Sequence, residues 1–535
     1  MISSNSSSEL KFVKLIKEQS DVIIVGTGLA GLTTALSIAE NNKHKVVLLS
    51  KVGVKKSNTQ YAQGGIAGVI DDRDSFALHI RDTVQAGAGL CNKEMVEVLV
   101  KEGKERIMDL IKDNFPFDKK DNKINLGKVG GHSNKRVLHT GGNSIGAKLI
   151  SFFADKLKNR DNIRIYDNNF VIELLTRDNK AYGVLAYDKK EKKYKVYIAP
   201  VIVLATGGCG NLYKNNSNPK TATGDGITLA YRAGAEVMDL EFMQYHPTVL
   251  ATNNFLISEA LRGEGAILRN DKNKRFMPGY HKLAELAPRD IVSRAIYNEI
   301  KKGNKGYVYL DITAIDTSIL KERFPIIHNM CISEGVDISK SYIPVKPAAH
   351  YLMGGIKVDS KGESSIENLF ACGEVAATGV HGANRLATNS LLEALVFAKR
   401  TAKEINIRSN KIKFNFKEEM NFSLKLIKIH SNNKIDARRQ EIQNLMEDKV
   451  GILRDEKELK FALRKFEEML KCSRYDSDSI EGFEVKNLLI LAQLMTKAAL
   501  IRKESRGAHF RKDYPEKKQT FQKHIVLKKV NHIIV

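Results

Sequence analysis

DVIIVGTGLAGLTTALSIAENNKHKVVLLS, residues 21–50, is the stretch that decides the fold. Residues 21–25 and 45–49 are apolar, β-branched runs of the kind found in buried strands. Between them, a GxGxxG loop at 26–31 opens a helical pattern that continues to about residue 41. A strand, this loop, a helix and a second strand make up the βαβ unit that binds dinucleotides. The sequence therefore predicts an α/β protein built on a Rossmann-like nucleotide-binding domain.

The glycines of this loop have distinct expected roles. Gly26 makes the tight turn, Gly28 lets a pyrophosphate approach the backbone, and Gly31 permits close packing of helix on strand. At the end of the second strand, where an acidic residue usually contacts the ribose of NAD, the chain has Ser50 and Lys51. That departure argues against an NAD-type ribose contact but leaves dinucleotide binding in place.

Three further glycine-rich segments are candidates for ligand contacts. Residues 57–65, SNTQYAQGG, follow the βαβ unit and read either as a surface turn or as a second cofactor contact. Residues 129–133, VGGHS, form a loop that could carry polar ligand contacts. In TGDG, residues 223–226, Asp225 is either a backbone cap or a partner for a ribose or ribityl hydroxyl.

Pattern changes along the chain indicate its organisation. Residues 162–204 read as a β-meander inserted in the nucleotide-binding domain, and 241–353 as a second domain with no nucleotide motif. Helical patterns cover 92–113 and 391–400. Beyond residue 402 the composition becomes rich in Lys, Glu and Leu with helical periodicity, which predicts a helical bundle.

Composition excludes several classes of protein. The net charge is 86 − 62 = +24, but no basic block interleaved with aromatic residues is present, so a lysine-rich surface is favoured over nucleic-acid binding. The five cysteines are far apart without a CxxC pair, which argues against zinc, iron–sulfur and disulfide frameworks and favours a reducing cytosol. No segment resembles a signal peptide or reaches the roughly 20 apolar residues of a membrane span. We expect a cytoplasmic protein with no metal, nucleic-acid or membrane partner.

Several ordered motifs together resemble a known family. They are YAQGGIAGV at 61–69, TGDGI at 223–227, HPT at 246–248, EALRGEGA at 259–266, LAPRDIVSRAI at 286–296, PAAHYLMGG at 347–355, GEVAATGVHGANRLATNSLLEALV at 373–396 and RKESRGAHF at 502–510. The chain resembles the succinate dehydrogenase/fumarate reductase flavoprotein superfamily and, within it, the L-aspartate oxidases, over nearly everything from about 20 to 515.

The resemblance implies a Rossmann-like FAD-binding domain with an inserted α+β capping domain and a C-terminal helical bundle. Its expected parts are a flexible tail at 1–19, an FAD-binding domain at 20–240 and 354–410, a capping domain at 241–353 and a helical domain at 411–535. Respiratory relatives attach FAD through a histidine that corresponds here to Asn58, so the FAD is expected to be non-covalent. The implied FAD contacts are Gly26, Thr27, Gly28, Leu29, Ala30, Gly31, Lys51, Asn58, Thr59, Gln60, Tyr61, Ala62, Gln63, Gly64, Gly65, Asp225, Glu374, Ser390 and Leu391.

The resemblance also implies a substrate site for a four-carbon dicarboxylate. Its substrate-binding residues are His246, Ser258, His350 and Arg385, and its catalytic residues are Arg289, Glu259 and Arg262. Arg385 suits a bidentate grip on a carboxylate, and the histidines donate most strongly if protonated. Arg289 would give a proton to fumarate, fed by Glu259 and Arg262, and would act electrostatically on aspartate. The base that takes the proton of the substrate ammonium is not identified.

The family resemblance implies oxidation of L-aspartate to iminoaspartate, with O2 or fumarate as electron acceptor. This would open the synthesis of NAD through quinolinate and would make quinolinate synthase a partner. One departure favours an alternative: Val129 stands where aspartate oxidases have a glutamate that can face the substrate ammonium. A soluble fumarate reductase or succinate dehydrogenase flavoprotein subunit is therefore the main rival, and a non-catalytic flavin-binding or nucleic-acid-binding protein is the second.

Overall fold

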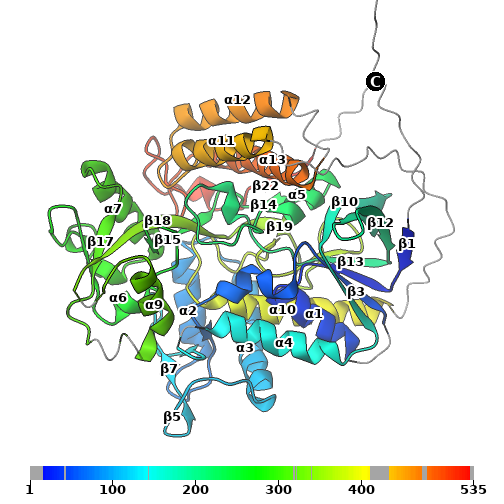
Figure 1. Cartoon of the computed structure of the whole chain (residues 1–535), viewed down its shortest axis with the longest axis horizontal. Coiled ribbons are helices and arrows are strands. Elements are labelled where there is room, and N and C mark those ends of the chain that lie inside the picture. The colour runs from blue at the N-terminus through cyan, green and yellow to red at the C-terminus, as the bar shows by residue number, and fades with distance from the viewer. Residues whose placement is uncertain are drawn as a thin grey trace, which may run out of the picture.

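The computed structural model describes residues 16–40, 44–142, 144–316, 320, 322–338, 340–409, 433–472 and 479–529. These residues form three parts: a nucleotide-binding domain around a parallel sheet, a capping domain beside it, and a helical region above both (Figure 1). Within the described residues no helix is long and apolar enough to cross a membrane.

The parallel sheet confirms the predicted Rossmann-like core. Its five strands lie in the order β20 (Leu369–Ala371), β13 (Val201–Leu204), β2 (Val22–Val25), β3 (Val46–Ser50) and β9 (Ile163–Asp167). Side chains alternate between its two faces, as the period of a strand requires. Val22, Ile24 and their neighbours pack under helices, whereas Ile23 and Val25 pack towards a second sheet.

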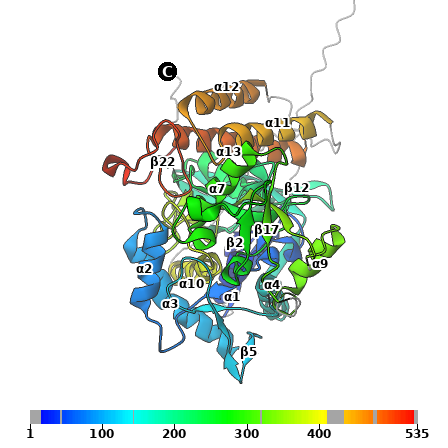
Figure 2. The same ribbon diagram turned by 90° about the vertical axis from the view of Figure 1, so that its left-hand side faces the viewer.

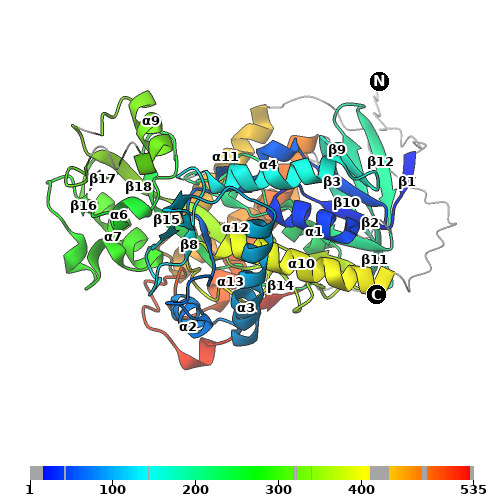
Figure 3. The same cartoon turned by 90° about the horizontal axis from the view of Figure 1, so that it is seen from below.

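Helices cover one face of this sheet. They are α1 (Leu29–Ala39), α4 (Ile145–Lys158), α3 (Lys93–Lys112) and α10 (Asn389–Ser409), with α2 (Phe76–Ala86) beside them (Figure 3). The predicted helix at 92–113 is thus nearly right. The helix predicted at 391–400 is too short at both ends, since α10 already begins at Asn389. Short strands β4 (Ile66–Ala67), β7 (Leu126–Gly127) and β8 (Val137–Leu138) form a small sheet, and β5 (Lys119–Lys120) pairs with β6 (Lys123–Ile124).

The meander covers the other face, with two corrections to the sequence analysis. Strands β10 (Asn169–Arg177), β11 (Lys180–Asp188) and β12 (Lys193–Ile198) are antiparallel, as expected. Residues 163–167 do not belong to this meander, because β9 extends the parallel sheet beside β3. The predicted tail at 1–19 is wrong for its last residues, because β1 (Ile16–Gln19) pairs in parallel with β12.

The capping domain has its own core. Strands β15 (Met243–Leu250), β18 (Ile343–Leu352), β17 (Val308–Asp311) and β16 (Ile267–Arg269) form an antiparallel sheet. Helices α6 (Ala260–Gly263), α7 (Arg289–Lys302) and α9 (Pro325–Ser333) pack with it. The long strands β15 and β18 run from this domain into the middle of the molecule (Figure 1) and so carry residues to the boundary between the domains.

The C-terminal region begins as the expected bundle. Helices α11 (Asn433–Lys449), α12 (Glu456–Cys472) and α13 (Ile480–Ile501) stack on one another (Figure 2). Helix α13 packs on α5 (Asp225–Arg232) (Figure 1). The predicted segment at 411–432 lies outside the described residues. After Ile501 the chain leaves the bundle, and β22 (Val526–Leu527) joins a sheet with β14 (Val237–Met238), β19 (Gly355–Lys357) and β21 (Ala376–Ala377).

Candidate active site

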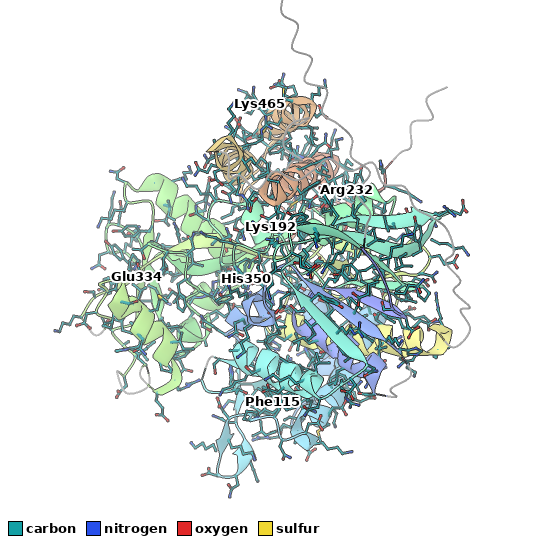
Figure 4. The ribbon with its side chains drawn as sticks, turned by 45° about the vertical axis from the view of Figure 1, so that its right-hand side comes forward. Phe115, Lys192, Arg232, Glu334, His350 and Lys465 are labelled. Atoms are coloured by element: carbon teal, nitrogen blue, oxygen red, sulfur yellow. The ribbon has the colours of Figure 1, made fainter. Side chains whose placement is uncertain are left out.

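A cavity of about 1010 Å³ lies between the nucleotide-binding and capping domains. His350 marks its position near the centre of the molecule, where the two domains meet (Figure 4). All but two of the residues predicted to bind cofactor or substrate or to act in catalysis line this one cavity; the exceptions are Gly31 and Arg262. Segments that are hundreds of residues apart in the sequence are therefore brought to the same space.

The glycine loop has the geometry that its motif predicts. Gly26 has a φ of +114°, and a Cβ on it would lie 2.2 Å from the carbonyl oxygen of Ala205. A Cβ on Gly31 would lie 2.0 Å from the Gly26 carbonyl oxygen, so this glycine serves packing and does not line the cavity. Helix α1 starts after Gly28 without a side-chain cap, so its N-terminus offers a favourable electrostatic environment to a phosphate.

Residues 57–65 wrap the cavity beside the glycine loop. Thr59 Oγ1 accepts a hydrogen bond from the Leu29 N–H at 3.3 Å, which joins the two segments. Ser57 Oγ, Gln60 Oε1 and Thr206 Oγ1 are buried cavity-lining atoms that have no partner among the described residues. Buried polar atoms without partners are costly, so these atoms fit a large polar ligand such as FAD.

Glu374 lies opposite Asn58 in the cavity wall. Its Oε1 accepts a hydrogen bond from the Leu352 N–H at 3.1 Å, and its Oε2 accepts one from Asn58 Nδ2 at 3.3 Å. Burial raises the pKa of Glu374 to about 7. Near neutral pH this carboxyl group can therefore also act as a hydrogen-bond donor.

Lys51 and Asp225 meet at another part of the cavity. Lys51 Nζ lies 2.9 Å from Asp225 Oδ2 and 2.7 Å from Thr223 Oγ1. Although burial alone would lower the pKa of Lys51, Asp225 and Glu484 raise it above its usual value, so the ammonium stays charged. The positive charge of Lys51, just after β3, and the negative charge of Asp225, at the start of α5, therefore form one polar corner of the cavity.

Two arginines at the capping-domain side share a single partner. Arg289 Nη1 and Arg385 Nη2 donate to Gln244 Oε1 at 3.1 and 3.2 Å. The amide nitrogen of Gln244 in turn donates to Asn384 Oδ1 at 2.9 Å and to the Arg385 carbonyl oxygen at 2.8 Å. Gln244 thus sets the separation of the two guanidinium groups.

Arg385 keeps an unused donor. Its Nη1 donates to Ser390 Oγ at 2.8 Å, and its guanidinium carbon lies 4.4 Å from the centre of the Tyr351 ring. Its buried Nε has no partner among the described residues. Burial, followed by the charge of Arg289, lowers the pKa of Arg385 to about 10, so the group is cationic at neutral pH. A ligand carboxylate would satisfy this donor.

The rings of His246 and His350 meet edge to face, with their centroids 5.3 Å apart. His350 is the extra residue of a β-bulge in β18, a feature that re-aims side chains at functional sites. Its Nδ1 lies 2.7 Å from Ser217 Oγ, and His246 Nδ1 lies 3.2 Å from the Thr248 N–H. Burial and the charge of Arg289 lower the pKa of both histidines well below the usual value. Both histidines are therefore neutral at neutral pH. The protonated form, which would be the stronger hydrogen-bond donor, is not the resting state.

A carboxylate connects Arg289 with Arg262. Arg289 Nε donates to Glu259 Oε2 at 2.5 Å, and Arg262 Nη2 lies 3.6 Å from the same oxygen. Although burial raises the pKa of Glu259, the two arginines lower it below the usual value. Arg262 lies behind Glu259, away from the cavity, and donates to the Glu285 carbonyl oxygen at 2.5 Å. Ser258 lines the cavity beside this group, and its Oγ accepts from the Ala260 N–H.

The loop at 129–133 differs from the expectation of polar ligand contacts. Val129 lines the cavity and packs against Val137 and Ala387. His132 does not line the cavity: its Nε2 lies 3.0 Å from the Ala387 carbonyl oxygen, and its Nδ1 lies 3.1 Å from an Arg136 nitrogen. This histidine supports the loop that precedes α10.

Sequence reasoning missed Gln244, Tyr351 and Asn384. Tyr351 and Asn384 occur within the quoted motifs, each next to a selected residue, and Gln244 lies two residues before the quoted HPT motif. The proximity of Gln244 to His246 on one strand was a usable signal, because residues i and i+2 share a face. The position of Asn384 beside Arg385 carried no comparable signal.

Comparisons with known proteins agree with this architecture. Residues 21–391 match the family model described as FAD binding domain, and residues 439–533 match that described as fumarate reductase flavoprotein C-term. The chain is 39% identical to an L-aspartate oxidase of Acinetobacter baylyi, over 95% of each chain. It is 40% identical to an L-aspartate oxidase of Bacillus subtilis, covering 94% of this chain and 92% of that one.

A solved structure of a mutant E. coli quinol fumarate reductase superposes with a TM-score of 0.90 at 32% identity, covering 96% of this chain and 94% of that one. Sequence and structure thus point to the same superfamily.

Proposed function

The chain belongs to the L-aspartate oxidase family of the succinate dehydrogenase/fumarate reductase flavoprotein superfamily, and we propose that it passes the electrons of L-aspartate to fumarate or O2. It is an FAD-dependent enzyme that oxidises L-aspartate. The proposal further assigns the cavity as the site where a four-carbon dicarboxylate is held at both ends.

One observation carries this proposal: the cavity holds two arginines fixed by Gln244, and one of them keeps a buried donor without a partner. A planar guanidinium matches the two oxygens of a carboxylate, and such charge-assisted contacts are the strong ones. His246 lies in the same cavity, and because its Nδ1 accepts from the Thr248 N–H, its Nε2 can donate to a carboxylate. These groups favour a small dianion over a neutral or cationic substrate.

Bound FAD supplies the hydride acceptor. The protein's part in aspartate oxidation is to hold the carboxylates and to remove a proton from the substrate ammonium. We assign this proton transfer to neutral His350, because its Nδ1 can donate to Ser217 Oγ and so leaves Nε2 as a proton acceptor. Arg289 and Arg385 stay cationic and cannot act as bases.

The same residues support the reduction of fumarate. There a proton must be delivered to carbon, and we assign this role to Arg289, a cationic donor that lines the cavity and is bonded to Glu259. Glu259 and Arg262 follow it in a line that leads away from the cavity and can restore its proton. Arg289 therefore acts as an acid when fumarate is reduced, and it stabilises the bound substrate electrostatically when L-aspartate is oxidised.

The electron acceptor can be tested with purified, FAD-loaded protein under anaerobic conditions. We expect succinate to form from fumarate in step with the loss of L-aspartate. Absence of succinate, with turnover restored by air, would show that O2 is the acceptor and would remove fumarate from the proposal.

Asn58 supports a non-covalent cofactor, because an amide side chain contacting Glu374 cannot form the covalent bond that a histidine can. The imine product is unstable in water, so an enzyme that uses it at once, quinolinate synthase, is the proposed partner. The reaction would then be the first step of NAD formation through quinolinate. A succinate dehydrogenase or fumarate reductase subunit remains the second candidate function, favoured by the apolar side chain of Val129 in the cavity wall.

Substituting Val129→Glu is expected to raise the ratio of L-aspartate to succinate oxidation by about tenfold or more, since a site that pairs a polar group discriminates strongly against an analogue that lacks it. The measurement is kcat/KM for both substrates in the variant and the wild type. Val129→Gln is the matched control, because glutamine has nearly the same shape as glutamate but carries no charge. An equal rise in both variants, or no change in V129E, would show that this position does not read the ammonium.

A further inference from the structure

We propose that Glu484 and Asn487 of α13 are positioning residues for the dinucleotide, so that FAD retention depends on the docking of the C-terminal helices. The inference rests on the proposed FAD site and adds the helical bundle to it. Neither residue lines the cavity. Both act through Lys51 and Asp225, which do line it.

Lys51 has a partner for each of its three ammonium protons. Its Nζ lies 2.7 Å from Thr223 Oγ1, 2.9 Å from Asp225 Oδ2 and 2.8 Å from Glu484 Oε1. The first two acceptors come from the loop before α5 and from the start of that helix, and the third comes from the C-terminal bundle. A lysine bonded in three directions is held in one place, although its side chain is long and flexible.

Asp225 is held on both of its oxygens. Lys51 and Thr223 donate to Oδ2, whereas Asn487 Nδ2 donates to Oδ1 at 2.7 Å. The orientation of the Asn487 amide is set by Arg232 Nη1, which donates to its oxygen at 2.5 Å. Arg232 lies at the end of α5, below the C-terminal helices (Figure 4). The carboxylate thus takes its orientation from α13.

Glu484 also connects two helices of the C-terminal bundle, α11 and α13. Its second oxygen lies 2.8 Å from Arg439 Nη2 on α11, so one carboxylate connects α11, α13 and the end of β3. Side chains of Glu484, Lys51 and Asp225 are each less than a fifth exposed. In such a place a cation that loses its counter-charge is strongly penalised.

This arrangement accounts for the missing acid of the Rossmann pattern. The usual carboxylate at the end of the second strand is replaced by Lys51. The structure supplies carboxylates there from two other elements, Asp225 on α5 and Glu484 on α13. Because one of them belongs to the bundle, the nucleotide-binding corner is complete only when the bundle is docked.

The test compares full-length, FAD-loaded wild type with Glu484→Gln. We expect the dissociation constant of FAD, followed by the fluorescence of released flavin, to rise by roughly tenfold to a hundredfold, the effect of one lost charged hydrogen bond. KM for L-aspartate in the FAD-saturated variant should stay within about twofold of the wild type, because the substrate end is untouched. Glu481→Gln is the matched control, since Glu481 lies one turn earlier on α13 and is exposed.

A second variant, Asn487→Ala, keeps the test decisive if E484Q does not fold. Here we expect the rise in melting temperature caused by added FAD to be smaller than in the wild type, whereas the E481Q control should keep it. Wild-type affinity for FAD in E484Q, or an undiminished FAD-induced shift in N487A, would overturn the inference. That result leaves the proposed function intact, because the latter fails only if the loaded wild type does not react with L-aspartate.

Discussion

Replacing Arg289 by leucine is expected to abolish fumarate reduction while leaving a measurable rate of L-aspartate oxidation. In the reductive direction the variant loses its proton donor, worth about 10²- to 10⁴-fold, in addition to a carboxylate contact. In the oxidative direction it loses only the contact, worth about 1.5–3 kcal/mol, or roughly 10- to 10²-fold. The two reactions should therefore separate by two orders of magnitude or more, measured as kcat/KM for each substrate.

The control for this variant is Lys301→Met on the same helix, at an exposed position outside the cavity. It removes one positive charge from α7 and should change neither reaction by more than about twofold, as is usual for surface substitutions. If R289L loses both reactions to the same extent, then Arg289 has no separate role as an acid, and the proton for fumarate must come from another group.

Replacing Arg385 by lysine is expected to lower kcat/KM for both L-aspartate and fumarate by roughly 10²- to 10⁴-fold. The charge is kept, but the planar fork is lost, and with it the contacts to Ser390 and Gln244 that fix the group. Two charge-assisted hydrogen bonds of about 1.5–3 kcal/mol each set the scale of the loss. FAD content should stay unchanged, since the flavin absorbance per chain reports cofactor binding separately from turnover.

Arg408→Lys provides the matched control for this substitution. Arg408 is also an arginine held by carboxylates, Glu363 and Glu404, but it lies outside the cavity. Its replacement should leave kcat/KM unaltered. A loss in R385K of less than about threefold would mean that charge alone, rather than the geometry of the guanidinium, holds the substrate.

Local pattern was sufficient for the core of the fold. Residues 21–50 carry strand, glycine loop, helix and strand in order, and the close approaches at Gly26 and Gly31 follow from that order alone. The edge strand at 163–167 was assigned to the wrong sheet, because an alternating run reads the same whether its partner is parallel or antiparallel. The strand at 16–19 was missed because its pairing depends on β12, far along the chain.

Site residues that belong to family motifs could be named from the sequence. Residues that act by connecting distant parts of the chain were missed. Gln244 acts by joining Arg289 to Arg385, and no local spacing in the sequence encodes a bridge over such separations. The neutral state of His246 and His350 depends on burial between domains, which composition does not reveal. The substitution of Lys51 for an acid was visible in the sequence, but Glu484 could be recognised as its partner only in the folded chain.

The central claim is that the cavity holds a dicarboxylate by both ends against bound FAD so that L-aspartate reduces the flavin. It is tested most directly by adding L-aspartate or succinate anaerobically to the purified, FAD-loaded protein and following the visible flavin absorbance. L-Aspartate is predicted to bleach the flavin, faster than succinate does. Bleaching by succinate alone, or by neither compound in a folded and flavin-loaded protein, would contradict the account.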